Sequence, residues 1–312
     1  MDLSIVATMY YSEPYIKEFY TRIKKEAEKI TKNYEIILVN DGSPDKSLDI
    51  AVSIHEKNKK VKVIDLSRNF GHHKAIMTGL RFAKGEKTFL IDCDLEEAPE
   101  LLGIFNQKLI SKKDTDVIYG IQKKRKGNLF EKFTGKAFYK IINKMSGINM
   151  PQNIITARLL TKRYVKSLLE FKEQEIYLAG LWHITGYKQV PVFVNKKSKG
   201  RSAYKFKHKL SIVINAVTSF SNKPLYWISN LGFLITCIAI VLVIYLVVKK
   251  YYFGIDVEGW TSLIVSMWFL GGVIISFIGI VGVYLSKVFI ETKNRPYNII
   301  RKIYGEKKKK KI

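Results

Sequence analysis

Cysteine is scarce in this sequence of 312 residues, which contains only Cys93 and Cys237. Cys237 lies inside an apolar run and offers Cys93 no evident partner. A disulfide framework and a cysteine-based metal site are therefore excluded, and we expect a reducing compartment. Residues 1–12 lack both a basic start and an apolar core, so we also expect no cleavable signal peptide.

Acidic residues are few, since 27 Asp and Glu stand against 53 Lys and Arg and leave a formal net charge of +26. So large a positive charge favours anionic partners, of which nucleic acid, anionic lipid and phosphorylated substrates are the main classes. Charge alone does not distinguish among these three partners.

Charged residues are absent from two long stretches near the C-terminus, residues 227–248 and 260–286. At a rise of about 1.5 Å per residue, each stretch is long enough as a helix to cross the ~30 Å hydrocarbon core of a bilayer. The second stretch is richer in glycine, which permits close contact between helices. We therefore expect two transmembrane helices, rather than two buried helices of a soluble core, joined by a short extracytoplasmic loop over residues 249–259.

Basic residues surround both stretches and set their expected orientation. Lys and Arg are concentrated between residues 196 and 223 and again in residues 287–312, whereas the basic residues of the 249–259 loop are offset by acidic ones. The positive-inside rule then places the N-terminal domain and both termini in the cytosol, with the chain in the cytoplasmic membrane. We expect residues 201–226 to form an amphipathic juxtamembrane segment, whose helix lies in the headgroup plane or packs on the soluble domain. Residues 287–312 are expected to form a basic cytoplasmic tail.

Apolar runs alternate with segments of helical periodicity throughout residues 1–200. This alternation predicts one α/β domain with a largely parallel sheet covered by helices. The expected strands are residues 3–8, 35–39, 61–66, 87–91 and 117–120. The expected helices are residues 13–30, 45–57, 73–83 and 98–111.

Three polar clusters follow predicted strands of this domain: Asp41-Gly42-Ser43, Arg68-Asn69-Phe70-Gly71 and Asp92-Cys93-Asp94-Leu95-Glu96. Ligands of open α/β sheets bind outside the carboxyl ends of the strands. The shared location therefore predicts that the three clusters form one site.

The third cluster places the carboxylates of Asp92, Asp94 and Glu96 close together, which is costly unless a cation offsets their repulsion. Oxygen ligands favour Mg²⁺ or Mn²⁺, usually shared with substrate phosphates. Such an ion makes a nucleoside diphosphate a good leaving group for sugar transfer. Asp41 is open to two interpretations, an acceptor for a nucleobase or ribose and a turn or helix cap.

Two adjacent histidines, His72 and His73, invite a metal-binding interpretation. No Cys or carboxylate accompanies them at ligand spacing. We therefore assign both residues to the entry of a helix.

The motifs, taken in order, resemble those of family 2 glycosyltransferases, specifically polyisoprenyl-phosphate glycosyltransferases of the dolichol-phosphate mannose synthase and bactoprenol glucosyltransferase type. The resemblance implies a Rossmann-like GT-A fold. It also implies inverting transfer of a hexose from a nucleotide sugar to polyprenyl phosphate, with a UDP-sugar favoured over GDP-mannose. The matching stretches are Thr8-Met9-Tyr10-Tyr11-Ser12-Glu13, Val39-Asn40-Asp41-Gly42-Ser43-Pro44-Asp45, Ser67-Arg68-Asn69-Phe70-Gly71, Asp92-Cys93-Asp94-Leu95-Glu96, Arg158-Leu159, Gly200-Arg201-Ser202-Ala203-Tyr204 and Ser219-Phe220-Ser221-Asn222-Lys223-Pro224-Leu225.

The same resemblance implies roles on the donor side of the reaction. Asp94 and Glu96 hold the metal ion, and catalysis involves Asp92, Asp94 and Arg158. The positions implied to bind the nucleotide sugar are Thr8, Tyr10, Glu13, Asp41, Ser43 and Asp92.

On the acceptor side, the resemblance implies that Lys197, Arg201, Ser202 and Tyr204 receive the lipid phosphate. Several family members assemble as tetramers, so a homo-oligomer is implied by analogy.

Four positions depart from the usual family pattern. Thr8 replaces a proline, Glu96 a glutamine and Lys197 an arginine, while Thr156 stands where an aspartate usually precedes the Arg-Leu pair. The last change removes a candidate general base. A phosphate monoester is mostly dianionic at pH 7, because its second pKa is about 6, so an acceptor of this kind needs positioning more than deprotonation.

Two other functions compete with this interpretation. A polysaccharide-extending synthase usually carries a Gln-X-X-Arg-Trp motif, and Trp182 has none around it. A non-catalytic membrane adaptor or nucleic-acid-binding protein fits the charge, but the retained Asp92-X-Asp94 pair argues against it. We therefore expect an enzyme with no nucleic-acid partner.

Overall fold

The computed structural model describes residues 1–122, 151, 153–195, 218, 221–253 and 259–305. The chain divides into two compact units. The first unit comprises Met1–Tyr139, Ile148–Tyr204 and Arg295–Ile312, and the second comprises Lys140–Gly147 and Lys205–Asn294. The first unit therefore contains residues from both sides of the apolar stretches.

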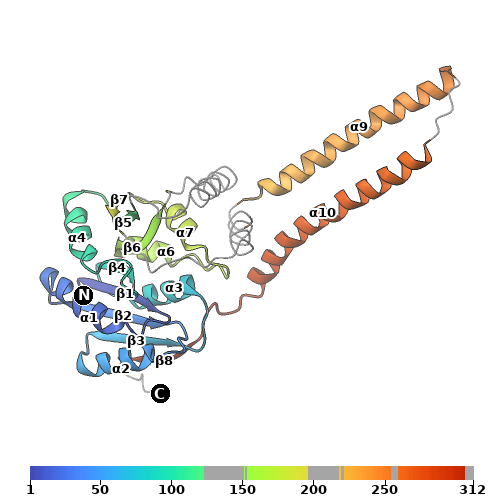
Figure 1. Ribbon diagram of the computed structural model, residues 1–312. Helices are drawn as coiled ribbons and strands as arrows, with labels where there is room; N and C mark the ends of the chain where they lie inside the picture. The colour runs from blue at the N-terminus through green and yellow to red at the C-terminus, as the bar shows by residue number, and fades with distance from the viewer. Residues whose placement is uncertain (123–150, 152, 196–217, 219–220, 254–258, 306–312) are drawn as a thin grey trace, which may run out of the picture. The chain divides into compact units, whose positions relative to one another are not determined.

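A mixed sheet forms the centre of the first unit (Figure 1). Its strands are β1 (Leu3–Met9), β2 (Tyr34–Asn40), β3 (Val61–Leu66), β4 (Lys87–Asp92), β5 (Val117–Gln122), β6 (Ile154–Thr161), β7 (Gln189–Val194) and β8 (Ile300–Tyr304). Their order across the sheet is β7-β5-β6-β4-β1-β2-β3-β8. Strands β4, β1, β2 and β3 are parallel, whereas β6 runs antiparallel to both β4 and β5. This arrangement confirms the predicted α/β fold with a largely parallel centre.

Helices cover both faces of this sheet, and their bounds are α1 (Ile16–Ile30), α2 (Ser47–Lys57), α3 (His72–Phe82), α4 (Leu101–Ser111), α6 (Lys162–Leu168) and α7 (Leu178–Ile184). One side of β1, including Ile5 and Ala7, packs into a core that also contains Phe19 of α1 and Phe105 of α4. The opposite side meets α3, where Gly79 lies directly against Val6. Both faces of β1 and β2 are buried, which explains why apolar residues dominate their sequences, as is usual for parallel central strands.

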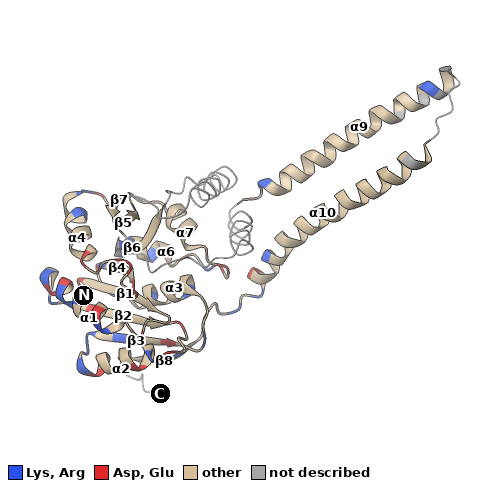
Figure 2. Cartoon of the chain, in the orientation of Figure 1, with Lys and Arg blue, Asp and Glu red and all other residues tan. Residues whose placement is uncertain are grey.

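The second unit contains two long helices, α9 (Lys223–Phe253) and α10 (Trp260–Thr292). Within them, Lys223–Leu246 and Ser262–Thr292 are long and apolar enough to cross a membrane, judged by length and composition. Figure 2 shows that the charged residues of both helices gather near the helix ends. The helices extend past the predicted limits of 227–248 and 260–286, so residues 249–253 of the predicted loop belong to α9. Most of the predicted juxtamembrane segment lies outside the described residues.

The prediction of a basic tail over residues 287–312 was wrong for part of this range, because α10 ends at Thr292 and Ile300–Tyr304 form β8. Strand β8 pairs antiparallel with β3 and forms one edge of the sheet, so this part of the supposed tail is built into the first unit. The Ser67 amide donates to the Ile299 carbonyl at 2.9 Å, which continues the pairing beyond the strand. The final lysine run lies outside the described residues.

Candidate active site

The carboxyl ends of the central strands β1, β2 and β4 lie side by side. Thr8 of β1 is paired with Val39 of β2 on one side and with Asp92 of β4 on the other. The first and third polar clusters follow these strands directly, and the second cluster follows the neighbouring β3. The structure thus brings together the three clusters that the strand pattern predicted.

Asp41 connects the first cluster to the second. Its carboxylate is buried, and it accepts hydrogen bonds from the amides of Phe70 at 2.8 Å and Gly71 at 3.1 Å. Burial raises the pKa of Asp41, and the two hydrogen bonds act against that rise. Gly42 has φ +62, and a Cβ atom at this position would overlap the backbone of Arg68. The close approach of the two loops therefore requires glycine at position 42.

Tyr10 presents an aromatic side chain beside these loops. It is 47% exposed and lies edge-on to Tyr11, with ring centroids 4.8 Å apart. The Tyr11 amide donates to Ser43 Oγ at 2.8 Å, which ties the end of β1 to the first cluster. An exposed ring here can stack on a planar ligand such as a nucleobase.

Glu13 fastens the start of α1 to the start of α2. Its carboxylate accepts from the amide of Lys46 at 3.1 Å, and its own amide donates to Asp45 Oδ2 at 3.1 Å. Ser43 donates to the other Asp45 oxygen at 2.6 Å. In this structure Glu13 and Ser43 hold the loops in place, and their implied contact with a nucleotide stays a prediction.

Asp92 lies between two side chains that hold its carboxylate. Thr8 Oγ1 donates to Asp92 Oδ1 at 3.1 Å, and His72 Nε2 lies 3.5 Å from the same oxygen. His72 Nδ1 is 3.3 Å from Thr8 Oγ1, so the three side chains contact one another. His72 begins α3 as predicted, but its position beside Asp92 was missed. The only sequence signal is that His72 directly follows the second cluster.

Asp94 and Glu96 lie in the turn after β4 and are partly exposed. The Glu96 amide donates to Asp94 Oδ1 at 3.0 Å, so both residues belong to one turn. Among the residues that the structure describes, no three His, Cys, Asp or Glu side chains converge on one metal position. Two carboxylates are nevertheless suitable oxygen ligands for a magnesium or manganese ion that a diphosphate also binds.

Glu97 is a buried carboxylate that the sequence did not single out. It is 1% exposed and accepts from the amides of Thr156 at 2.9 Å and Ala157 at 2.7 Å. The acid-rich turn after β4 is thereby fixed to β6. The family usually has an aspartate at the position of Thr156. In this chain the Glu97 carboxylate contacts the backbone at that position instead.

Arg158 is buried within the first unit instead of facing an open site. Its guanidinium lies over the ring of Trp182 and donates to the carbonyls of Ile155 at 3.1 Å and Thr156 at 3.2 Å. Burial lowers the pKa of Arg158 to about 9. With 1% of its surface exposed, Arg158 does not face solvent, and its implied part in catalysis stays a prediction.

Known proteins are similar to this chain in sequence and in fold. Residues 4–169 match Glycosyl transferase family 2. A Mycobacterium tuberculosis (strain CDC 1551 / Oshkosh) protein, whose name assigns it to the glycosyltransferases, is 51% identical over 98% of this chain and 89% of its own length. The chain belongs to glycosyltransferase family 2. The family predicted from the ordered motifs is thereby confirmed.

More distant relatives of this glycosyltransferase cover nearly the whole chain as well. The SfII prophage-derived bactoprenol glucosyl transferase of Shigella flexneri is 29% identical over 97% of this chain and 98% of its own length. Among solved structures, the glucosyl-3-phosphoglycerate synthase of Mycobacterium tuberculosis has a TM-score of 0.52 and 14% identity, covering 70% of this chain and 79% of that one. The structural likeness confirms the GT-A fold.

The acceptor residues predicted for this glycosyltransferase are outside the part of the chain that the structure describes. They are Lys197, Arg201, Ser202 and Tyr204. Their contact with a lipid phosphate stays a prediction.

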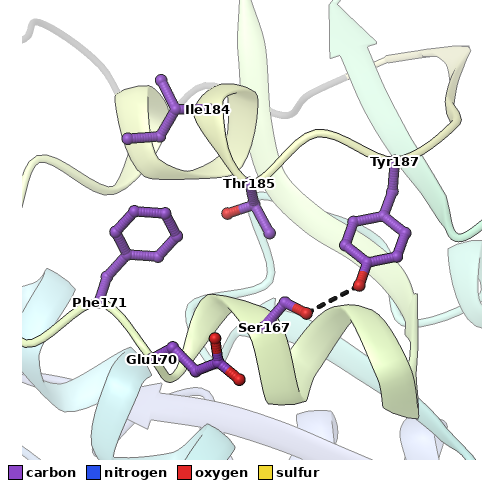
Figure 3. Close-up of a pocket in the computed structure, with 6 residues that line it drawn as sticks. All are labelled: Ser167, Glu170, Phe171, Ile184, Thr185 and Tyr187. Carbon is purple, nitrogen blue, oxygen red and sulfur yellow. Dashed lines mark hydrogen bonds between the residues drawn. The ribbon is translucent and has the colours of Figure 1, made fainter.

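A separate hollow of about 400 Å³ lies between the C-terminal ends of α6 and α7 (Figure 3). Ser167 and Tyr187 are joined by a hydrogen bond at one side of it, with their hydroxyl oxygens 2.8 Å apart. None of the predicted donor-site residues lines it. The lining residues are Ser167, Glu170, Phe171, Ile184, Thr185 and Tyr187.

Proposed function

We propose that this glycosyltransferase is a membrane-bound, inverting enzyme that moves a hexose from a nucleotide sugar to polyprenyl phosphate. The observation that carries the proposal is the combination, in one chain, of a strand-end carboxylate site with two helices apolar enough to span a bilayer. A lipid-linked acceptor fits both parts, because the apolar helices would hold the catalytic domain at the membrane that contains the lipid. The bactoprenol glucosyl transferase relatives, similar over nearly the whole chain, support the same acceptor class.

The path of the chain supports a two-span arrangement. After α10, residues 300–304 return to the sheet of the first unit as β8. A chain that leaves the catalytic domain and returns to it crosses a membrane an even number of times. Two spans, with the catalytic domain on the cytosolic side of the cytoplasmic membrane, satisfy this condition and the positive-inside rule together.

The donor fits the exposed edge of the sheet. Tyr10 is available to stack on the nucleobase, and the loops around Asp41 lie beside it. Asp94 and Glu96 would hold a magnesium or manganese ion, which neutralises charge on the diphosphate when bound. We favour a UDP-hexose as donor, with GDP-mannose second, for modification of a cell-surface glycan.

The transfer itself is a single displacement. An oxygen of the acceptor's phosphate dianion forms a bond to the anomeric carbon, and the bond from that carbon to the diphosphate breaks. The bonding electrons leave with the nucleoside diphosphate, and the configuration at the anomeric carbon inverts. Because the attacking phosphate is already ionised near pH 7, the absence of an aspartate at position 156 does not block this step.

A donor panel tests the proposal. Purified full-length enzyme is mixed with polyprenyl phosphate, Mg²⁺ or Mn²⁺, and radiolabelled UDP-glucose, UDP-galactose, UDP-N-acetylglucosamine or GDP-mannose. We expect label in the organic phase for one donor, with a UDP-sugar the first candidate. Label found only in a growing water-soluble polysaccharide would instead favour the chain-extending synthase.

A further inference from the structure

Strand β8, which follows the second long helix, carries an irregularity at Arg301. Lys302 is paired with Asp65 of β3, whereas Ile300 is paired with the next residue, Leu66. Arg301 is therefore the extra residue of a β-bulge. Bulges redirect side chains and are frequent beside active sites.

The redirected side chain of Arg301 contacts the end of β3 at two points. Its guanidinium lies 3.6 Å from Asp65 Oδ2 and donates to the carbonyl oxygen of Ser67. The Asp65 side chain is only 3% exposed, and a buried carboxylate without a partner is costly. The positive charge of Arg301 thus stabilises the buried carboxylate of Asp65.

The contact at Asp65 continues into the first polar cluster. Asn40 at the end of β2 is 2% exposed and donates from Nδ2 to Asp65 Oδ1 at 2.8 Å. The Asn40 side-chain oxygen in turn accepts from the amide of Ser43 at 3.2 Å. A continuous path of contacts therefore joins Arg301 to the loop that contains Asp41.

The contact at Ser67 continues into the second polar cluster. Ser67 is held on both sides, because Arg301 binds its carbonyl and the Ile299 carbonyl accepts from its amide. The chain then passes to Phe70 and Gly71, whose amides bind the Asp41 carboxylate. Both paths from β8 meet at Asp41.

We propose that Arg301 is a positioning residue of the donor site, and that β8 fixes the two loops that receive the nucleoside diphosphate. The inference rests on the proposed function, because it takes the strand-end loops as the donor site. According to this inference, β8, which follows the second long helix, helps to hold the donor site in shape. Removing the guanidinium takes the Arg301 cation away from Asp65 and removes the hydrogen bond to the Ser67 carbonyl. Each of the two loops then loses one of the contacts that support it.

Other contacts keep β8 in place when Arg301 is changed. Asn298 donates to Thr78 of α3, and the Tyr297 ring lies under the guanidinium of Arg81, 4.4 Å from ring centroid to Cζ. Arg301 itself is largely exposed. A variant at this position should therefore fold, and its effect should be confined to the two loops.

The experiment compares full-length wild type with Arg301→Ala, Arg301→Lys and the neighbouring control Lys302→Ala. Lys302 is also an exposed cation of β8, but its ammonium lies over Tyr304, which is paired with Val63 near the start of β3. Calorimetric titration with UDP and with GDP gives the Kd, and hydrogen exchange reports protection of residues 67–71. Thermal unfolding of each variant verifies that it is folded.

We expect Arg301→Ala to raise the Kd about tenfold, which corresponds to about 1.4 kcal/mol, and to lose protection at residues 67–71. Arg301→Lys keeps the positive charge but has a single nitrogen in place of the two that contact Asp65 and Ser67. Its Kd should lie between those of wild type and Arg301→Ala. Lys302→Ala should bind as wild type does. In turnover, the donor KM should rise with kcat nearly unchanged.

Unchanged binding and exchange in a folded Arg301→Ala would overturn the inference, as would equal losses in Arg301→Ala and Lys302→Ala. A wild-type protein that binds nucleoside diphosphate but makes no glycolipid would contradict the proposed function alone. A wild-type protein that binds neither UDP nor GDP would contradict both.

Discussion

Thr8 Oγ1 donates a hydrogen bond to Asp92 Oδ1 at 3.1 Å, across the ends of two neighbouring parallel strands. The family usually has proline at position 8, which has no hydroxyl to donate. In this chain the departure from the family pattern therefore adds a contact to a carboxylate that is implied to bind the nucleotide sugar. The bond fixes the orientation of Asp92 before the donor arrives, which is how preorganised sites reduce the cost of binding.

Replacing Thr8 with valine removes this hydroxyl while keeping a side chain of similar shape. A hydrogen bond to a charged group contributes about 1.5 kcal/mol, so kcat/KM for the donor should fall roughly tenfold. Steady-state kinetics at varied donor concentration measure the loss. Thr8→Ser retains the hydroxyl and serves as the control. Equal rates for the valine and serine variants would show that this bond does not position Asp92.

His72 should matter because its ring contacts both Asp92 and Thr8. Replacing His72 with alanine releases the Asp92 carboxylate on one side, and we expect kcat/KM to fall roughly tenfold. His183 is an exposed histidine of α7 and provides a matched control. If His72→Ala is as active as His183→Ala, the His72 ring does not position Asp92. Its role is then only to begin the helix, as its sequence position suggested.

Asp94 is predicted to bind the metal ion. Asp94→Ala and Asp94→Asn should each abolish detectable transfer, because neither side chain brings the negative charge that a divalent ion requires. Wild-type turnover should stop with a chelator and return with added Mg²⁺ or Mn²⁺. Asp49→Ala, on the exposed face of α2, should leave both responses unchanged. Turnover by folded Asp94→Ala would show that the metal assignment is wrong.

Glu97 should contribute to stability through the two amides that it accepts from β6. Glu97→Ala leaves buried N–H groups without an acceptor, at a cost of about 1–3 kcal/mol for each. We expect Tm to fall by several degrees, on the basis of about 2–4 °C per kcal/mol for a domain of this size. Glu97→Gln retains one acceptor and should lose less. Thermal unfolding in detergent gives both values, and an alanine variant as stable as wild type would refute the assignment.

The centre of the fold was predictable from sequence because buried parallel strands are continuous apolar runs. Strands β1 to β5 agree with the predicted bounds to within two residues at each end. The same regularity located the three polar clusters, since the residues that follow parallel strands share one edge of the sheet.

Strand β8 could not be predicted in this way. It is short, contains Arg301 and Lys302, and lies in a sequence whose positive charge is typical of a solvated tail. Only its tertiary pairing with β3 makes it a strand. His72 and Glu97 were missed for a related reason, because each gains its role from a residue distant in sequence. Arg158 carried a family motif, but its burial under Trp182 depends on packing that no local pattern reveals.

The most direct test of the central claim is the mass of the lipid product. Purified wild-type enzyme is incubated with polyprenyl phosphate, Mg²⁺ and the donor chosen from the panel, and the organic extract is analysed by mass spectrometry, with Asp94→Asn as the inactive control. We predict one new species, the polyprenyl phosphate carrying a single hexose, in the wild-type extract only. An unmodified lipid after incubation with every donor, in the presence of folded and nucleotide-binding enzyme, would contradict the account.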